Sequence, residues 1–152
     1  MVIRDWSSDV CSSDLPALPW RDRAMFAELM LNFDLRSYHE VQAKEAPVFF
    51  DRGVPDSIGY LRLCGLPVPE HFCRAAGAFR YARIVFVAPP WREIYAQDAE
   101  RKQDFAEAAH TYQAVTAAYR EQGYELVELP RADVETRVAF VLDCVRGLAF
   151  DR

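Results

Sequence analysis

Residues 47–56 read PVFFDRGVPD, and this stretch decides how the rest of the chain is interpreted. Its apolar, β-favouring run at 47–50 ends abruptly in an acid, a base and a glycine, namely Asp51, Arg52 and Gly53. In an open α/β sheet, such a run predicts a buried strand that delivers its last residue to the carboxyl edge of the sheet, where ligands bind. The sequence therefore predicts a strand over 47–50 and a functional site directly after it.

Alternating helix and strand signals surround this stretch. Apolar residues at helical spacing, with proline starts and glycine stops, predict helices over about 19–43, 55–65, 70–79 and 91–122, and from 133 onward. The expected strands cover 47–50, 82–87 and 124–129. This order predicts an α/β layered domain with a mostly parallel sheet, in which 82–87 is a central strand. The last helix is expected to begin at the N-cap Asp133 and to use five apolar residues: Val134, Val138, Val141, Leu142 and Val145.

The composition limits the class of protein. With 152 residues and 51% hydrophobic content, the chain has the size and apolar content of one ordinary domain. A formal net charge of -5 argues against a broad DNA- or RNA-binding surface, and no apolar run approaches the roughly 18 residues that a membrane helix needs. Four cysteines without a CxxC pair favour reduced, buried thiols. These features predict a soluble, cytoplasmic protein whose partners are small molecules.

The first fifteen residues differ from everything that follows. MVIRDWSSDVCSSDL is rich in Ser and Asp and lacks both a sustained periodicity and the apolar stretch of a signal peptide. Its last eleven residues resemble the translation of a common sequencing-library adapter. We therefore expect 1–15 to be an artefactual, non-native segment and 16–149 to form a partial domain.

The triplet after the predicted strand has two interpretations. In the first, Asp51 caps the following turn and Arg52 pairs with it on the surface. In the second, Asp51 is a base or a ligand in a magnesium shell, and the planar guanidinium of Arg52 grips an anionic group. Phosphoryl transfer uses such groups, because its catalysis consists mainly of positioning and charge neutralisation.

A second charged cluster, at 91–104, also has two interpretations. Asp98 and Arg101 share one face of the expected helix, so the cluster is either a solvated, mutually paired surface or a mobile lid. In a lid, Arg92 and Arg101 would close over phosphates. The three histidines are scattered and match no zinc pattern, and no Ser-His-Asp or Cys-His constellation can be assembled.

Four segments, in this order, resemble a known family. They are FAELMLNFDLRSYHE, PVFFDRGVPDSIGYLRLCGLPVPEHF, RIVFVAPPWREIYAQDAERKQDFAEAAHTYQAV and GYELVELPRADVETRVAFVL. Their order and spacing resemble bacterial AAA-type predicted ATPases of the NadR-like P-loop group. The resemblance implies a nucleotide-kinase-like fold with ATP and Mg as cofactors. It makes FFDRG a Walker-B-like strand and implies catalytic roles for Asp51, Arg52 and Arg101, an indirect magnesium contact for Asp51, and cofactor binding by Arg92 and Asp98.

The chain departs from this family at one point. P-loop families hold the phosphates with a GxxxxGK[ST] loop after the first strand, but none of the six glycines here precedes a Lys-Ser or Lys-Thr pair. We therefore expect an incomplete three-layer P-loop NTPase fold that lacks the first strand and the Walker A loop. The strands over 47–50 and 82–87 would then lack their shared neighbour, which predicts marginal stability.

Three functional hypotheses remain. The first is an ATP-binding protein with kinase-like phosphoryl transfer to a small hydroxyl-bearing acceptor, which would lie near the helices around Tyr60 and His71. The second is a nucleotide-dependent switch or binding module without kinase activity. The third concerns the present chain alone, which would be an inactive fragment because the main phosphate loop is missing.

Overall fold

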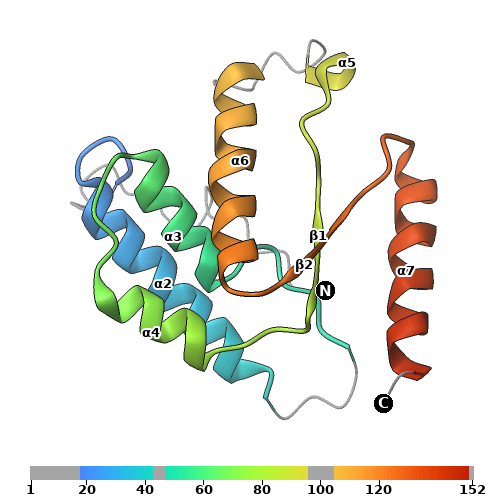
Figure 1. The fold of residues 1–152 in the computed structure, drawn as a ribbon, viewed down its shortest axis with the longest axis horizontal. Coiled ribbons are helices and arrows are strands. Elements are labelled where there is room, and N and C mark those ends of the chain that lie inside the picture. Colours follow the sequence, from blue (N-terminus) through green and yellow to red (C-terminus); the bar gives the residue numbers. More distant parts are fainter. Residues whose placement is uncertain (1–17, 43–46, 96–104, 151–152) are drawn as a thin grey trace. The chain divides into compact units, whose positions relative to one another are not determined.

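The computed structural model describes residues 18–42, 47–95 and 105–150. The chain divides into two compact units, Met1–Tyr81 and Ala82–Arg152. Figure 1 labels the helices and strands that belong to them. The first unit is helical and the second carries a sheet. The structure therefore confirms a mixed α/β chain.

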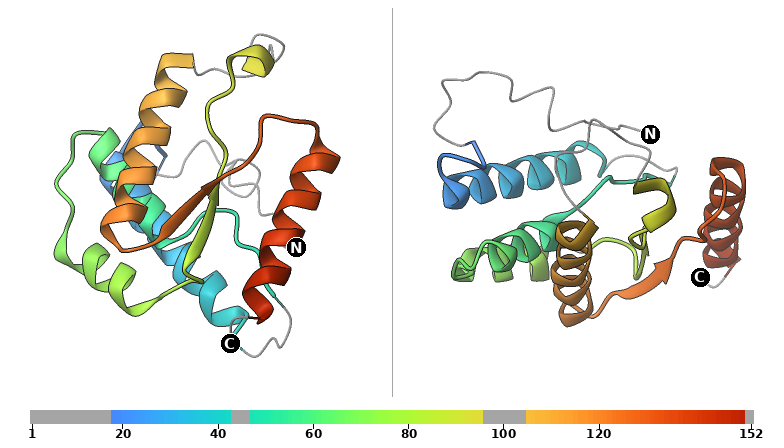
Figure 2. Two further views of the ribbon diagram at one scale, coloured as in Figure 1. Left: turned by 45° about the vertical axis from the view of Figure 1, so that its right-hand side comes forward. Right: turned by 90° about the horizontal axis from the view of Figure 1, so that it is seen from above.

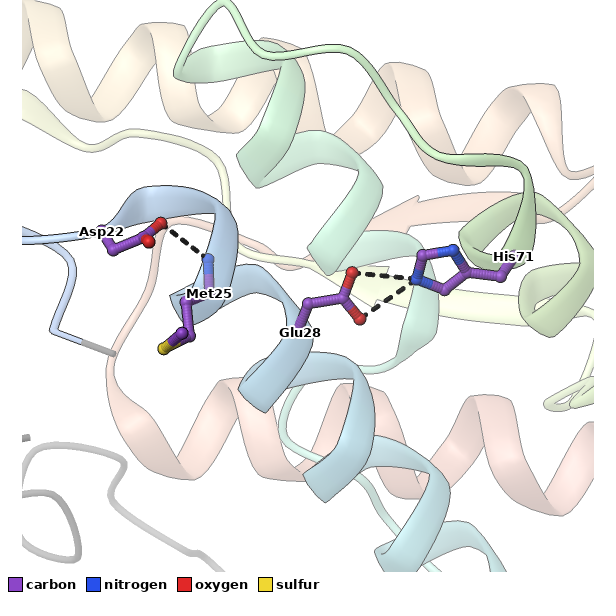
Figure 3. Close-up of polar contacts among 4 residues, drawn as sticks. All are labelled: Asp22, Met25, Glu28 and His71. Carbon is purple, nitrogen blue, oxygen red and sulfur yellow. Dashed lines mark hydrogen bonds and ion pairs between the residues drawn. The ribbon is translucent and has the colours of Figure 1, made fainter. Parts of the chain in front are cut away.

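The first unit consists of three helices, α2 (Arg23–Glu40), α3 (Val54–Leu63) and α4 (Glu70–Ala78). The α2 helix begins where the Asp22 side chain accepts a hydrogen bond from the Met25 backbone N–H at 2.9 Å, as Figure 3 shows. This bond satisfies one of the backbone donors that the first turn of a helix leaves free. The α3 helix ends before Gly65, whose φ of 68° is a left-handed conformation that glycine adopts without strain.

The three helices enclose the principal core of the described residues. The α3 helix packs against both α2 and α4, and α2 lies over α3 and α4 in the right-hand view of Figure 2. The spacing of buried residues on each helix follows the helical period, as the sequence predicts. The core side chains are those of Leu18, Ala27, Met30, Leu31, Val54, Ile58, Leu61, Phe72, Ala75 and Ala76.

The second unit contains the sheet, in which β1 (Ile84–Val87) and β2 (Glu125–Glu128) pair in parallel. Ile84 aligns with Glu125 and Val87 with Glu128. The α6 helix (Phe105–Glu121) connects back to β2, and its Tyr119 packs edge to face on Tyr124 with ring centroids 5.5 Å apart. The connection turns at Gly123, with a φ of 78°. The parallel pairing and both strand positions are confirmed.

The α7 helix (Val134–Phe150) begins as predicted but does not bury its apolar face. Asp133 caps it by accepting a hydrogen bond from the Thr136 backbone N–H at 2.8 Å. Hydrogen bonding by the Thr136 side chain, and then by its backbone N–H, lowers the pKa of the Asp133 carboxyl. However, Val134 and Val138 are 61% and 51% exposed, and Leu142 is also exposed. Within the described part of the second unit, α7 makes no extensive contact with another element (Figure 1). The helix itself is confirmed, but three of its five apolar residues are exposed and Val141 and Val145 are partly exposed.

The predicted strand over 47–50 is also wrong. These residues are not part of the sheet, which among the described residues contains β1 and β2 alone. A strand requires a neighbouring strand to satisfy its backbone hydrogen bonds. Here Phe50 instead packs its ring on those of Tyr81 and Tyr38, at centroid distances of 5.1 and 6.5 Å.

The position of β1 in the sheet also differs from the expectation. Within the described chain, β1 pairs with β2 along one edge and has no strand on its other edge, so it is not a central strand there.

Two further features complete the fold. The helix expected over 91–122 is described as α5 (Arg92–Tyr95) and α6, and residues 96–104 lie outside the described part. None of the described helices is both long and apolar enough to cross a membrane. The described cysteines, Cys64, Cys73 and Cys144, are free thiols, but none is buried and Cys73 is exposed, so the expectation of buried thiols is wrong for them.

Candidate functional site

The candidate site is the turn formed by Asp51, Arg52 and Gly53, which leads into α3. Arg52 adopts a φ of 77°, and it is the one non-glycine residue with a positive φ in the described chain. Left-handed backbone is strained for residues with a side chain, and such strain concentrates where a function requires it. The side chains of Asp51 and Arg52 are exposed, and neither has a hydrogen-bond or ion-pair partner among the described residues. Both are therefore accessible to a ligand.

The backbone after this turn is held by Tyr81. Its hydroxyl accepts a hydrogen bond from the Val54 backbone N–H at 3.2 Å. Its ring lies so close to Gly53 that an added Cβ would stand 2.8 Å from two ring carbons. Gly53 has a φ of -170°, an ordinary extended conformation that any residue can adopt. Glycine is therefore required here by the close packing of Tyr81 and not by the backbone conformation. The exposed charges of Asp51 and Arg52 therefore stand on a tightly packed base.

A buried carboxylate caps the start of α3. Asp56 accepts a hydrogen bond from the Gly53 backbone N–H at 3.0 Å, and its own N–H donates to the Gly53 carbonyl at 2.8 Å. The Val54 backbone N–H also donates a hydrogen bond, to the Tyr81 hydroxyl. The first backbone N–H groups of α3 therefore already have partners within the protein. Consequently the helix start is not itself an open anion site, and an anion at this turn would depend on Arg52.

A second buried carboxyl, Asp34 on α2, belongs to the same region. It is 8% exposed, and its pKa is raised from 3.8 to about 7. Burial is the largest cause, because it penalises the charged form, and the negative charge of Asp56 acts in the same direction. The positive charge of Arg52 and the hydroxyl of Ser57 lower the pKa. Asp34 is therefore electrostatically linked to the turn.

Ser57 is the fourth polar group of this region. Its side chain is completely buried on α3, and its hydroxyl has no hydrogen-bond partner within the described chain. The hydroxyl acts on the Asp34 carboxyl, although its approach does not reach the geometry of a full hydrogen bond. A buried polar group without a partner is costly, so its retention at this position requires a reason.

Sequence reasoning identified Asp51, Arg52 and Gly53 but missed the buried groups behind them. Two signals were available. Asp34 continues the spacing of Ala27 and Leu31, so the helical period places an acid on the apolar face of α2. Asp56 occupies the third position of a helix that begins after a glycine, which is where a capping carboxylate stands.

The second predicted cluster is described in part. Arg92 lies at the start of α5 with its guanidinium carbon 4.4 Å from the centre of the Phe105 ring, in the geometry of a cation–π contact. Asp98 and Arg101 lie outside the described residues. Because Asp51 and Arg92 belong to units that are described separately, the expectation that they act together stays a prediction.

The residues expected near the acceptor make structural contacts. His71 on α4 and Glu28 on α2 form a half-exposed pair with a nitrogen–oxygen distance of 2.9 Å, drawn in Figure 3. Tyr60 packs edge to face on Phe26 at 5.3 Å, and burial raises the pKa of its hydroxyl. Both contacts join α2 to the other helices of the first unit.

No group of three or more His, Cys, Asp or Glu side chains that could hold a metal occurs in the described chain. A magnesium ion at this turn would therefore be held by Asp51, by water and by the phosphates of a bound nucleotide. This arrangement fits Mg²⁺, which usually keeps several waters and uses one or two carboxylates. An exposed carboxylate without a protein partner suits this role.

Comparison with known proteins gave one match. A family model described as an AAA domain matches residues 2–137, which is most of the chain and includes both units in large part. The matched range contains the Asp51–Gly53 turn, Asp34 and the segment after β1. Searches of curated proteins and of solved structures returned no significant match.

Proposed function

Because the chain belongs to the AAA-domain family of P-loop NTPases, we propose that the Asp51–Gly53 turn is the part of a nucleotide site that handles magnesium and phosphate. The family membership supports nucleotide binding. In the complete protein, we propose kinase-like transfer of a phosphoryl group from ATP to a small hydroxyl-bearing molecule. This reaction type is proposed because members of the NadR-like group resemble nucleoside and nucleotide kinases in fold.

The observation that carries this proposal is the left-handed Arg52 between an exposed carboxylate and a buried glycine. A turn whose purpose was only to connect two segments would favour Gly or Asn at a positive φ, since either residue adopts it at lower cost. Keeping arginine there costs stability, and the benefit is a guanidinium placed beside a carboxylate on a fixed base. This pair of charges is suited to phosphate and magnesium.

Each residue then has a defined role. Asp51 holds the magnesium shell or accepts the proton of the attacking hydroxyl, and the guanidinium of Arg52 binds phosphate oxygens. Bound Mg·ATP supplies the phosphoryl group and charge neutralisation. Arg92 and Arg101 are proposed to neutralise phosphate charge from the segment after β1, with Asp98 in the same segment contacting the cofactor.

We further propose that the present chain is inactive by itself. The printed sequence contains no GxxxxGK[ST] loop, and that loop provides most of the backbone donors that hold the β- and γ-phosphates in P-loop proteins. Asp51 and Arg52 alone form an incomplete cradle. Weak binding of nucleotide, in the millimolar range, is therefore expected of this chain.

Titration of the ¹⁵N-labelled chain with Mg·ATP tests both proposals. The largest shifts are expected at Asp51, Arg52 and Gly53, at millimolar nucleotide. Arg52→Ala should remove them, whereas Arg36→Ala, which removes an exposed arginine from α2, should leave them unchanged. Shifts that survive Arg52→Ala would contradict the site. Binding at micromolar nucleotide would contradict the inactive state of this chain.

The kinase activity is tested on a complete family member. ADP formation that rises when a nucleoside or other hydroxyl-bearing acceptor is added is expected for phosphoryl transfer. ADP formation that no acceptor changes would contradict it. Asparagine in place of the aspartate that corresponds to Asp51 should abolish acceptor-dependent turnover.

A further inference from the structure

The left-handed Arg52 lies between two contacts made by one residue that is distant in the sequence, Tyr81. Before the turn, the Tyr81 ring packs edge to face on Phe50, with ring centroids 5.1 Å apart. After the turn, the same ring lies against Gly53, and the Tyr81 hydroxyl accepts a hydrogen bond from the Val54 backbone N–H at 3.2 Å. Tyr81 therefore contacts the chain on both sides of the two charged residues.

A strained backbone conformation needs such contacts. Residues in sparsely populated conformations persist only where the surrounding structure restrains them. Asp56 contributes, because it accepts a hydrogen bond from the Gly53 N–H at 3.0 Å, but it belongs to the same helix start and acts only after Arg52. Tyr81 reaches both sides of the turn from the segment that follows α4. It is therefore placed to restrain Arg52 from both ends.

Tyr81 is itself held by α2. The ring of Tyr38 packs edge to face on that of Tyr81, with centroids 5.6 Å apart. The Tyr38 hydroxyl also donates a hydrogen bond to the Arg80 carbonyl at 3.0 Å, which fixes the backbone directly before Tyr81. Aromatic pairs prefer this edge-to-face geometry. The Tyr81 ring is therefore supported from behind while it presses on Gly53.

We propose that Tyr81 is a positioning residue for Arg52. It keeps Arg52 in the left-handed conformation and thereby fixes the direction in which the guanidinium leaves the turn. A guanidinium on a restrained backbone loses less conformational freedom when it binds a phosphate, so binding is tighter. In its meaning for phosphate binding, this inference rests on the function proposed above. Tyr81 acts through the backbone of the turn and not through a contact with the nucleotide.

The first test measures the conformation of Arg52 by NMR in the ligand-free chain. The nuclear Overhauser effect between the N–H and Hα of one residue is strong when φ is positive, so wild type should show a strong effect at Arg52. Tyr81→Leu removes the ring and the hydroxyl and should lose it. Tyr81→Phe keeps the ring and should retain it. In Tyr81→Phe, the Val54 N–H should exchange with solvent roughly tenfold faster, because it loses its acceptor.

Tyr38→Phe is the matched control, because it removes one hydroxyl from the ring that packs on Tyr81, and that hydroxyl does not bond to the turn. It should leave the signals of Arg52 and Val54 unchanged. Slow exchange of the Ile58 N–H shows that a variant keeps α3 folded. A strong Arg52 effect in folded Tyr81→Leu would overturn the proposal, as would Val54 exchange that Tyr81→Phe leaves unchanged. If Tyr81→Leu does not fold, Tyr81→Phe decides.

The second test adds Mg·ATP and follows the N–H signal of Arg52. Compared with wild type, Tyr81→Phe should need roughly threefold more nucleotide for the same shift and Tyr81→Leu roughly tenfold more, whereas Tyr38→Phe should match wild type. If Tyr81→Leu loses the left-handed conformation but binds Mg·ATP as wild type does, the positioning role is overturned. If wild type itself shows no shift while Tyr81→Leu loses the left-handed conformation, the proposed function is contradicted and the hold of Tyr81 on the turn is supported.

Discussion

Apolar residues at helical spacing are buried in the first unit, whereas similar residues on α7 of the second unit are exposed. In the first unit, the periodic residues of α2, α3 and α4 meet one another and are buried, with Phe72 at 1% exposure. In the second unit, α7 carries a comparable apolar stripe, yet Val138 on that stripe is 51% exposed. Periodicity indicates which face of a helix seeks a partner, but burial requires that the chain supply one. The first unit does so within a short sequence span, and the described part of the second does not.

The largest expected difference between the two units is that between truncating Phe72 in the first and Val138 in the second. Phe72→Ala should lower the free energy of unfolding by about 3 to 5 kcal/mol, because it removes a fully buried ring and leaves a cavity. Val138→Ala on α7 should change it by less than about 0.5 kcal/mol, because the side chain is already half in water. Urea unfolding of both variants gives the difference. Equal losses would show that the exposed face of α7 is covered in solution.

The buried Asp34 carboxyl should make the free energy of unfolding of the first unit depend on pH. Its native pKa of about 7 lies above the ordinary 3.8, so the folded chain binds this proton more tightly than the unfolded chain. The stabilisation from this proton is complete below about pH 4 and is lost as the pH rises through 7. Asp34→Asn should therefore be more stable than wild type by roughly 3 to 4 kcal/mol at pH 8, with little difference at pH 4.

The measurement is urea unfolding of wild type and Asp34→Asn at intervals of pH. Asp22→Asn replaces the exposed acid that caps α2 with another residue that can cap it, so it serves as the control and should give no such trend. A difference between Asp34→Asn and wild type that stays constant from pH 4 to 8 would contradict the buried charge.

Gly53 tests the fit of the turn against Tyr81. Gly53→Ala should destabilise the chain by about 1 to 3 kcal/mol, because the new Cβ would stand 2.8 Å from ring carbons of Tyr81. Gly77→Ala is the control, since its Cβ would meet nothing within 4 Å. It lies inside α4 and should stabilise by up to about 1 kcal/mol. Thermal melting of the two variants should move in opposite directions. A neutral Gly53→Ala would show that Tyr81 yields easily.

Arg52 gives the smallest expected effect on stability. Arg52→Gly should stabilise the chain by roughly 0.5 to 1 kcal/mol, because glycine adopts a φ of 77° without strain. The same change at Arg36, inside α2, should destabilise by about 1 kcal/mol. The gain at Arg52 should accompany a loss of the nucleotide response proposed above. A destabilised Arg52→Gly variant would contradict the view that arginine is kept there at the expense of stability.

Much of the local structure could be predicted from the sequence because its causes are local. Asp133 starts a helix, and Gly65 and Gly123 end helices, since capping and left-handed backbone depend on a few neighbouring residues. Both strands of the parallel pair were also predicted, from short apolar runs. The charged turn at Asp51 and Arg52 was recognisable for the same reason, because an apolar run ends there in two charges and a glycine.

The tertiary structure decided everything that depends on which elements meet. The apolar run before Asp51 packs Phe50 on aromatic side chains and joins no strand, because backbone pairing needs a neighbour that a local pattern cannot supply. The near-neutral pKa of Asp34 arises from burial between helices and from charges carried by a different segment. Capping and periodicity act over a few residues and are written in the sequence, whereas burial and electrostatic coupling act through space and exist only once the helices have packed.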